Sequence, residues 1–129
     1  MTTSHDNIEE AARRLWDAAQ QGTPCAPVRE LIEDGDIDAA YAVQEINTLR
    51  AVEAGRRLTG RKIGLTSKAV QAQLGVDQPD YGMLFADMDV PEGEDISLSA
   101  VLQPKVEAEI AFVLGDDLDN PQLTMADVM

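Results

Sequence analysis

Apolar residues recur at helical spacing near the start of the chain. Over about residues 7–21 they fall on one face of a helix, which predicts a buried stripe. The stripe consists of Ile8, Ala11, Ala12, Leu15, Trp16 and Ala19. Asp6 can cap this helix, with Glu9 as its capping-box partner, and Gly22 can end it.

A second stretch with helical spacing starts at Asp36 or Asp38 and continues to about Ala54. Residues 23–28, between the two stretches, are rich in proline and predict a loop. We therefore predict an N-terminal helical section over residues 1–60.

Short strands are predicted to follow this helical section. Residues 61–65 predict a strand that ends at Thr66 and Ser67. Two more short strands are predicted at residues 83–86 and 96–98. This change of pattern marks a mixed α/β region.

Ser67 can cap a helix over residues 68–74, which Gly75 would close. A strand that leads through a glycine-containing loop into a helix presents free backbone N–H groups, to which anions bind. Lys62 is close to this loop in sequence and would add a positive charge, although its spacing fits a surface lysine equally well. The loop is therefore a candidate anion-binding site.

Residues 106–114 are rich in Val, Ile, Phe and Leu, which predicts a strand. Side chains alternate along a strand, so Glu107 and Glu109 would share one face with their Cα atoms about 7 Å apart. Two carboxylates in this arrangement suit a hard divalent cation. A strand with one face in solvent would also alternate in this way. Because Ala111 and Val113 continue the same face, the mouth of a partly buried site is favoured.

Composition limits the classes of function. At 129 residues with 44% hydrophobic content, the chain is long enough for one domain with a core. A net charge of -14 argues against nucleic acid and anionic membranes as partners. No apolar run approaches the roughly 18 residues that span a bilayer, and the first residues do not resemble a signal peptide. We therefore expect a cytoplasmic protein.

The last residues predict the start of another helix. Thr124 can cap a helix of which only residues 125–129 are present. A single turn of helix is marginal as the end of a domain, so we expect the chain to stop in mid-domain.

Four segments resemble, in order and spacing, the 2-keto-4-pentenoate hydratases, also called 2-hydroxypenta-2,4-dienoate hydratases, of the fumarylacetoacetate hydrolase superfamily. These segments are Gly-Arg-Lys-Ile-Gly-Leu-Thr-Ser at 60–67, Gln-Leu-Gly-Val-Asp-Gln-Pro-Asp-Tyr-Gly at 73–82, Leu-Phe-Ala-Asp-Met at 84–88 and Leu-Gln-Pro-Lys-Val-Glu-Ala-Glu at 102–109. The similarity extends from about Asp38 to the last residue. The Lys-Ile-Gly-Leu-Thr-Ser and Glu-x-Glu motifs are shared with the 4-oxalocrotonate decarboxylases and 2-oxohept-4-ene-1,7-dioate hydratases.

The resemblance implies a mixed α/β (α+β) fold, in which the helical section leads into a rolled β-sheet with flanking helices. Residues 61–129 would form the N-terminal part of the catalytic domain, truncated at residue 129. Members of the family bind Mg2+ or Mn2+ through three carboxylates, two of which match Glu107 and Glu109. The third comes from a glutamate about thirty residues later, a position that lies beyond Met129.

The resemblance also implies the roles of other residues. Lys62 and Asp80 would be the catalytic residues, and how they divide the acid and base steps stays open. Leu65, Thr66 and Ser67 would bind the substrate carboxylate. The reaction would be that of a hydro-lyase in the meta-cleavage catabolism of aromatic compounds, which adds water to a small 2-hydroxy-dienoate or its 2-oxo-enoate tautomer.

Two other functions stay open. One is the decarboxylase reaction of the sister enzymes, for which a dicarboxylate substrate needs a second anion-binding group. The other is a truncated, non-catalytic chain that associates with a full-length partner. Full-length relatives are homo-oligomers, and some pair with a decarboxylase relative, so association of this kind is expected.

Overall fold

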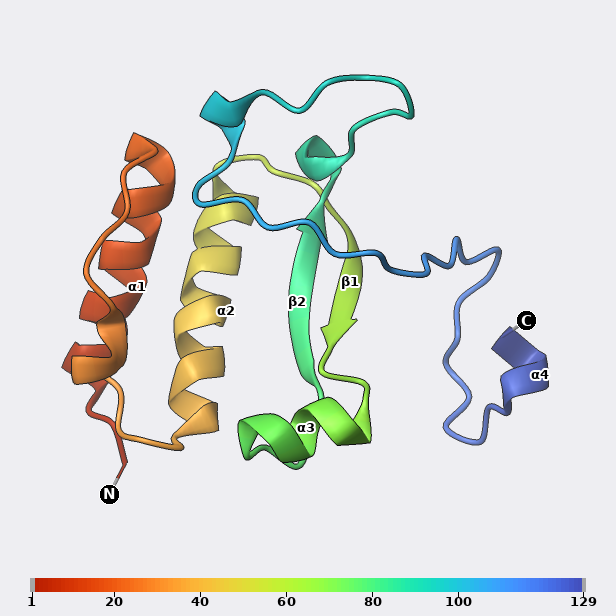
Figure 1. Ribbon diagram of the computed structural model, residues 1–129, viewed down its shortest axis with the longest axis horizontal. Coiled ribbons are helices and arrows are strands. Elements are labelled where there is room, and N and C mark those ends of the chain that lie inside the picture. Colours follow the sequence, from red (N-terminus) through yellow and green to blue (C-terminus); the bar gives the residue numbers. More distant parts are fainter. Residues whose placement is uncertain (1, 129) are drawn as a thin grey trace.

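The computed structural model describes residues 2–128, in which a pair of helices lies beside a two-stranded sheet (Figure 1). The regular elements are α1 (His5–Gln21), α2 (Ile37–Glu53), β1 (Leu58–Gly64), α3 (Lys68–Leu74), β2 (Asp80–Phe85) and α4 (Met125–Val128). Short 3-10 turns occur at Val28–Glu30, Ala86–Met88 and Leu98–Ala100. The predicted mixture of helix and strand is confirmed.

Both N-terminal helices form where the pattern predicts them, and their caps decide the first residue. Helix α1 begins two residues early because Ser4, and not Asp6, is the N-cap, with its Oγ accepting from the Asn7 N–H at 3.3 Å. At the start of α2, Asp36 accepts from the Ala39 N–H at 3.0 Å. Gly22 ends α1 in the left-handed conformation, as expected.

The core between α1 and α2 is built from small residues. Ala11 and Ala12 are fully buried and pack with Val43 of α2. The predicted stripe is only partly right, because Leu15 is 40% exposed and Ala18 is buried in place of Ala19. Trp16, expected in the core, is half-buried. The helices meet along a narrow seam, and alanines permit this close approach.

Strands β1 and β2 form an antiparallel pair that positions the candidate site. Opposite residues include Lys62 with Gly82 and Gly64 with Asp80. Residues 80–82, expected in a linker, belong to β2. The prediction missed them because Pro79 and Gly82 are turn-forming residues, whereas hydrogen bonds to β1 decide the outcome.

Helix α2 covers the outer edge of β2 with two polar side chains. The Tyr41 hydroxyl accepts from the Tyr81 N–H at 3.1 Å. The Gln44 Nε2 donates to the Tyr81 carbonyl oxygen at 3.0 Å. Both backbone groups of Tyr81 are thereby satisfied without a third strand.

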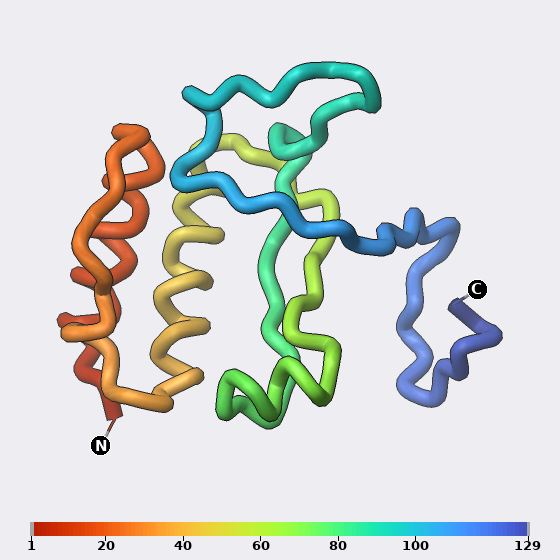
Figure 2. The backbone as a smooth tube through the Cα atoms, in the orientation of Figure 1, coloured from red at the N-terminus to blue at the C-terminus, as the bar shows by residue number. Residues whose placement is uncertain are grey.

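The strand predicted at residues 106–114 is absent. This segment has no regular secondary structure, and Val106 and Val113 are each 99% exposed. Figure 2 shows the chain after Ala100 crossing the hairpin as an extended tube. Within residues 2–128 the one sheet contains only β1 and β2, so no strand supplies hydrogen bonds to this segment. The sequence of this segment has the composition of a strand, but the described sheet contains no neighbouring strand that pairs with it.

Two further predictions concern the C-terminal part of the chain, and one of them is wrong. The prediction of a strand at residues 96–98 is wrong. A 3-10 turn begins at Leu98 and continues to Ala100. Helix α4 begins at Met125 as expected, and Met129 lies outside the described residues.

Among the described helices, none has the length and apolar character needed to cross a membrane. The cytoplasmic location and the division at residue 60 stay predictions.

Candidate active site

The hairpin places Lys62 and Asp80 on the same face of the sheet. Residues directly opposite in an antiparallel pair share a face, as do residues two apart on one strand. Lys62 is opposite Gly82, and Asp80 is opposite Gly64, which is two residues after Lys62. Lys62 and Asp80 are therefore diagonal neighbours, with glycines at the other two corners.

These two glycines leave the space that the Lys62 and Asp80 side chains occupy. A Cβ added at Gly82 would lie 3.0 Å from Lys62 Cγ and 3.3 Å from its Cδ. A Cβ added at Gly64 would overlap Asp80 Oδ1. The lysine stem and the aspartate carboxylate thus lie directly over glycine backbone.

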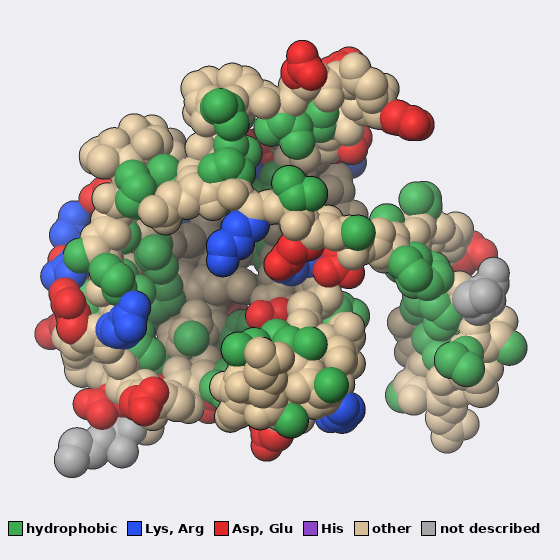
Figure 3. Space-filling view, in the orientation of Figure 1, with side chains coloured by type: hydrophobic (Ala, Val, Ile, Leu, Met, Phe, Trp, Pro, Cys, Tyr) green, Lys and Arg blue, Asp and Glu red, His purple; other side chains and the backbone are tan. Residues whose placement is uncertain are grey.

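One cavity of about 510 Å³ brings together every predicted site residue. Its lining is Lys62, Gly64, Leu65, Thr66, Ser67, Val70, Asp80, Glu107, Ala108 and Glu109. The end of β1, the following loop, the start of β2 and the extended segment all contribute. Figure 3 shows acidic and basic side chains gathered around a hollow near the middle of this face.

The carboxylates of the cavity suit a cation, but they do not form a complete metal site. Within residues 2–128, no three His, Cys, Asp or Glu side chains come close enough to hold a metal ion. Glu107 and Glu109 both line the cavity and would supply two of the three carboxylates that the resemblance implies. Carboxylate oxygens are the donors that Mg2+, Mn2+ and Ca2+ prefer, so the residues present fit such an ion in chemistry.

The loop between β1 and α3 has an unusual backbone. Leu65 has a φ of +53°, in the left-handed region that non-glycine residues rarely adopt. Ser67 occupies the N-cap position of α3 as predicted, but its side chain makes no capping hydrogen bond. Its hydroxyl is therefore not committed to the helix.

Sequence reasoning missed Gln71 of α3. This side chain is 3% exposed, and its Nε2 donates to the Leu65 carbonyl oxygen at 2.5 Å. A glutamine in a short helix directly after a candidate anion loop was the available signal, but burial of its amide could not be read from spacing.

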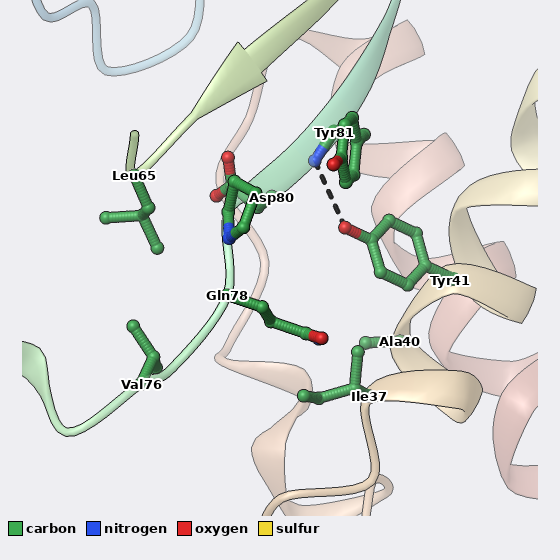
Figure 4. A pocket seen from close by; sticks show the side chains of 9 residues that line it. Ile37, Ala40, Tyr41, Leu65, Val76, Gln78, Asp80 and Tyr81 are labelled. Carbon is green, nitrogen blue, oxygen red and sulfur yellow. Dashed lines mark hydrogen bonds between the residues drawn. The ribbon is translucent and has the colours of Figure 1, made fainter. Parts of the chain in front are cut away.

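A second, smaller cavity of about 290 Å³ adjoins the first. It is lined mainly by apolar side chains from α2 and the α3–β2 connection, including Ile37, Val76 and Pro79. Leu65 and Asp80 line both cavities. Figure 4 shows these side chains around the space, with the Tyr41 hydroxyl hydrogen-bonded to the backbone of Tyr81.

No protein-family model matches the chain. The TodF product hydratase of Pseudomonas putida F1 is 67% identical over 121 residues, which are 94% of this chain and 45% of that protein. The 2-keto-4-pentenoate hydratase 2 of Dechloromonas aromatica is 56% identical over all of this chain and 49% of its own length. The resemblance to the 2-keto-4-pentenoate hydratases is confirmed. The chain spans about half the length of these hydratases.

More distant relatives also match over only part of their own length. The 2-hydroxyhexa-2,4-dienoate hydratase of Comamonas testosteroni is 40% identical over 95% of this chain and 47% of its own length. Among solved structures, 4-oxalocrotonate decarboxylase from Pseudomonas putida G7, complexed with calcium and acetate, matches with a TM-score of 0.69. That match has 28% identity and covers 78% of this chain and 39% of the decarboxylase. An α/β fold related to that of the decarboxylase is therefore supported.

Proposed function

We propose that this chain carries the first part of the active site of a metal-dependent hydratase of the fumarylacetoacetate hydrolase fold. The reaction converts 2-hydroxypenta-2,4-dienoate to 4-hydroxy-2-oxopentanoate in the meta-cleavage catabolism of aromatic compounds. The observation that supports it most is the cavity itself. Its lining brings together residues of three motif segments that lie up to 47 positions apart, from Lys62 to Glu109.

The proposed chemistry follows from the lining residues. The dienol loses its hydroxyl proton and gains one at C5, after which the hydroxyl of water adds to C4 and a proton to C3. Lys62 is the one basic residue among the described lining residues, so it can hold or deliver a proton at the 2-oxygen, where charge develops. Asp80, diagonal to it, can take the proton of the attacking water. Thr66 and Ser67 offer backbone N–H and hydroxyl groups to the substrate carboxylate.

Glu107 and Glu109 are the residues that would hold a divalent cation. The related decarboxylase structure contains calcium, which supports a divalent site, and Mg2+ or Mn2+ is our choice for this chain. When bound, such an ion would supply Lewis-acid stabilisation of the negative charge that develops on the substrate as its enolate forms. Both glutamates lie in a segment without regular secondary structure, and their side chains are exposed.

The composition of the cavity favours the hydratase over the decarboxylase. A dicarboxylate substrate needs a second cationic group, and Lys62 is the one basic residue among the described lining residues. The relatives at 56% and 67% identity are named hydratases, whereas the decarboxylase is 28% identical. We also propose that the chain works in a homo-oligomer or pairs with a decarboxylase relative.

The dienol absorbance of 2-hydroxypenta-2,4-dienoate tests the proposal. We expect metal-dependent loss of this absorbance with Mn2+, its arrest by EDTA, and a product heavier by one water. Loss of carbon dioxide would assign the decarboxylase reaction. Absence of both turnover and Mn2+ binding would support a non-catalytic chain.

Gly64→Ala is expected to lower the hydration rate by more than about tenfold while the hairpin stays folded, because its Cβ overlaps Asp80 Oδ1 and displaces the carboxylate. Gly60→Ala is the matched control. Gly60 is on the same strand as Gly64, but its Cβ would lie 3.8 Å from Leu84 Cδ1 of β2, which is an ordinary contact. Turnover gives the hydration rate of both variants, and circular dichroism shows whether they stay folded. Equal rates for the two would contradict the role of Gly64.

A further inference from the structure

The left-handed backbone of Leu65 needs a cause. Its φ of +53° is disfavoured because the Cβ approaches the following carbonyl group. Glycine is the residue that adopts this conformation without cost, and the chain has a leucine here. Such a residue persists where its surroundings hold it, and these positions concentrate at functional sites. Leu65 lies on the wall of both cavities.

Gln71 holds both ends of the loop formed by residues 65–67. Its side-chain Nε2 donates to the Leu65 carbonyl oxygen at 2.5 Å. Its backbone N–H donates to the Ser67 carbonyl oxygen at 2.9 Å. The bond to Ser67 is the ordinary backbone bond at the start of α3, so what the Gln71 side chain adds is a hold on the Leu65 peptide.

Both polar atoms of the Gln71 amide have a hydrogen-bond partner in this arrangement. Its Oε1 accepts from Lys68 Nζ at 3.0 Å, while its Nε2 bonds to Leu65. At 3% exposure, an unpaired amide would carry a desolvation cost, and an apolar side chain would fill the position without one. Packing alone therefore does not explain a glutamine at this position, whereas a left-handed carbonyl that needs a donor does.

We propose that Gln71 is a positioning residue, which fixes the left-handed Leu65 peptide and thereby orients Thr66 and Ser67 toward the substrate carboxylate. The second half of this statement rests on the proposed function, because it requires that the loop binds that carboxylate. The first half concerns the backbone alone. The two parts can be measured separately in the same chain.

The test compares Gln71→Met with Gln73→Met, the same replacement at an exposed position of α3. NMR of Leu65, through its HN–Hα coupling and carbon shifts, reports whether its backbone is left-handed. Titration of the Thr66 and Ser67 amides with 2-oxopentanoate, a saturated 2-oxo acid that cannot be hydrated, gives a Kd in the presence of diamagnetic Mg2+. We expect Gln71→Met to lose the left-handed signature and to raise this Kd about tenfold, and Gln73→Met to change neither.

Three outcomes separate the alternatives. An unchanged Leu65 signature in Gln71→Met overturns the inference. A changed signature with an unchanged Kd overturns the positioning role and leaves a purely structural one. Failure of the wild-type chain to bind 2-oxopentanoate counts against the proposed function, while the Leu65 signature still tests whether Gln71 holds the loop.

Gln71→Glu keeps the test decisive if the methionine variant does not fold. Glutamate has the same shape and keeps an acceptor for Lys68, but its ionised carboxylate has no N–H to donate to Leu65. We expect the same loss of the left-handed signature and the same rise in Kd. A glutamate variant that behaves like the wild type would overturn the inference.

Discussion

Replacing Glu107 or Glu109 by glutamine is expected to lower metal-dependent hydration by at least about 100-fold without unfolding the protein. Both side chains are exposed and lie outside regular secondary structure, so neither contributes to the core. In the part of the chain that the structure describes, the core lies between α1 and α2. The loss should therefore come from weaker metal binding, since an amide oxygen is a poorer ligand than a carboxylate for a hard cation.

Electron paramagnetic resonance of free Mn2+ measures this binding directly, alongside turnover of the dienol. Glu94→Gln is the matched control, because it removes one negative charge from an acidic segment that does not line the cavity. We expect the control to bind Mn2+ as the wild type does. If Glu107→Gln and Glu109→Gln bind Mn2+ with the affinity of the wild type, the metal site does not lie in this segment. Equal losses in all three variants would show a diffuse effect of net charge.

Local signals predicted the helices well. The cap at Asp36, the left-handed Gly22 and the limits of α3 each depend on residues within a few positions of the helix end. Such contacts are encoded in neighbouring sequence, so spacing suffices to predict them. The exchange of Asp6 for Ser4 as the cap of α1 shows how close the competition is between two capping residues two positions apart.

Contacts between residues far apart in the chain could not be predicted from the sequence pattern. The 106–114 segment has strand composition, but a strand also needs a hydrogen-bonding neighbour, and the described sheet offers none. The pairing of Gly64 with Asp80 depends on the register between β1 and β2, which no short motif specifies. The metal and catalytic candidates were nevertheless predicted as one site, because the resemblance carried information about a fold that local spacing lacks.

The division of work between Lys62 and Asp80 leads to the second large effect. Lys62→Met and Asp80→Asn are each expected to lower kcat by about 10²–10⁴-fold, the usual contribution of general acid–base catalysis. They should differ in a partial reaction, the exchange of the C3 protons of 2-oxopentanoate in deuterated water. Lys62 is the one cation among the described lining residues, and an enolate at the 2-oxygen needs a cation close to it. Lys62→Met should therefore lose the exchange.

Asp80→Asn should retain that exchange and lose hydration alone, because the aspartate acts on the water that attacks C4. Arg61→Met is the control, since Arg61 is next to Lys62 on β1 but does not line the cavity. Proton NMR in deuterated water measures exchange in all three variants. Loss of exchange in Asp80→Asn with retention in Lys62→Met would reverse the two roles. Loss in both variants would mean that the diagonal pair transfers the proton together, because neither group then enolises the substrate alone.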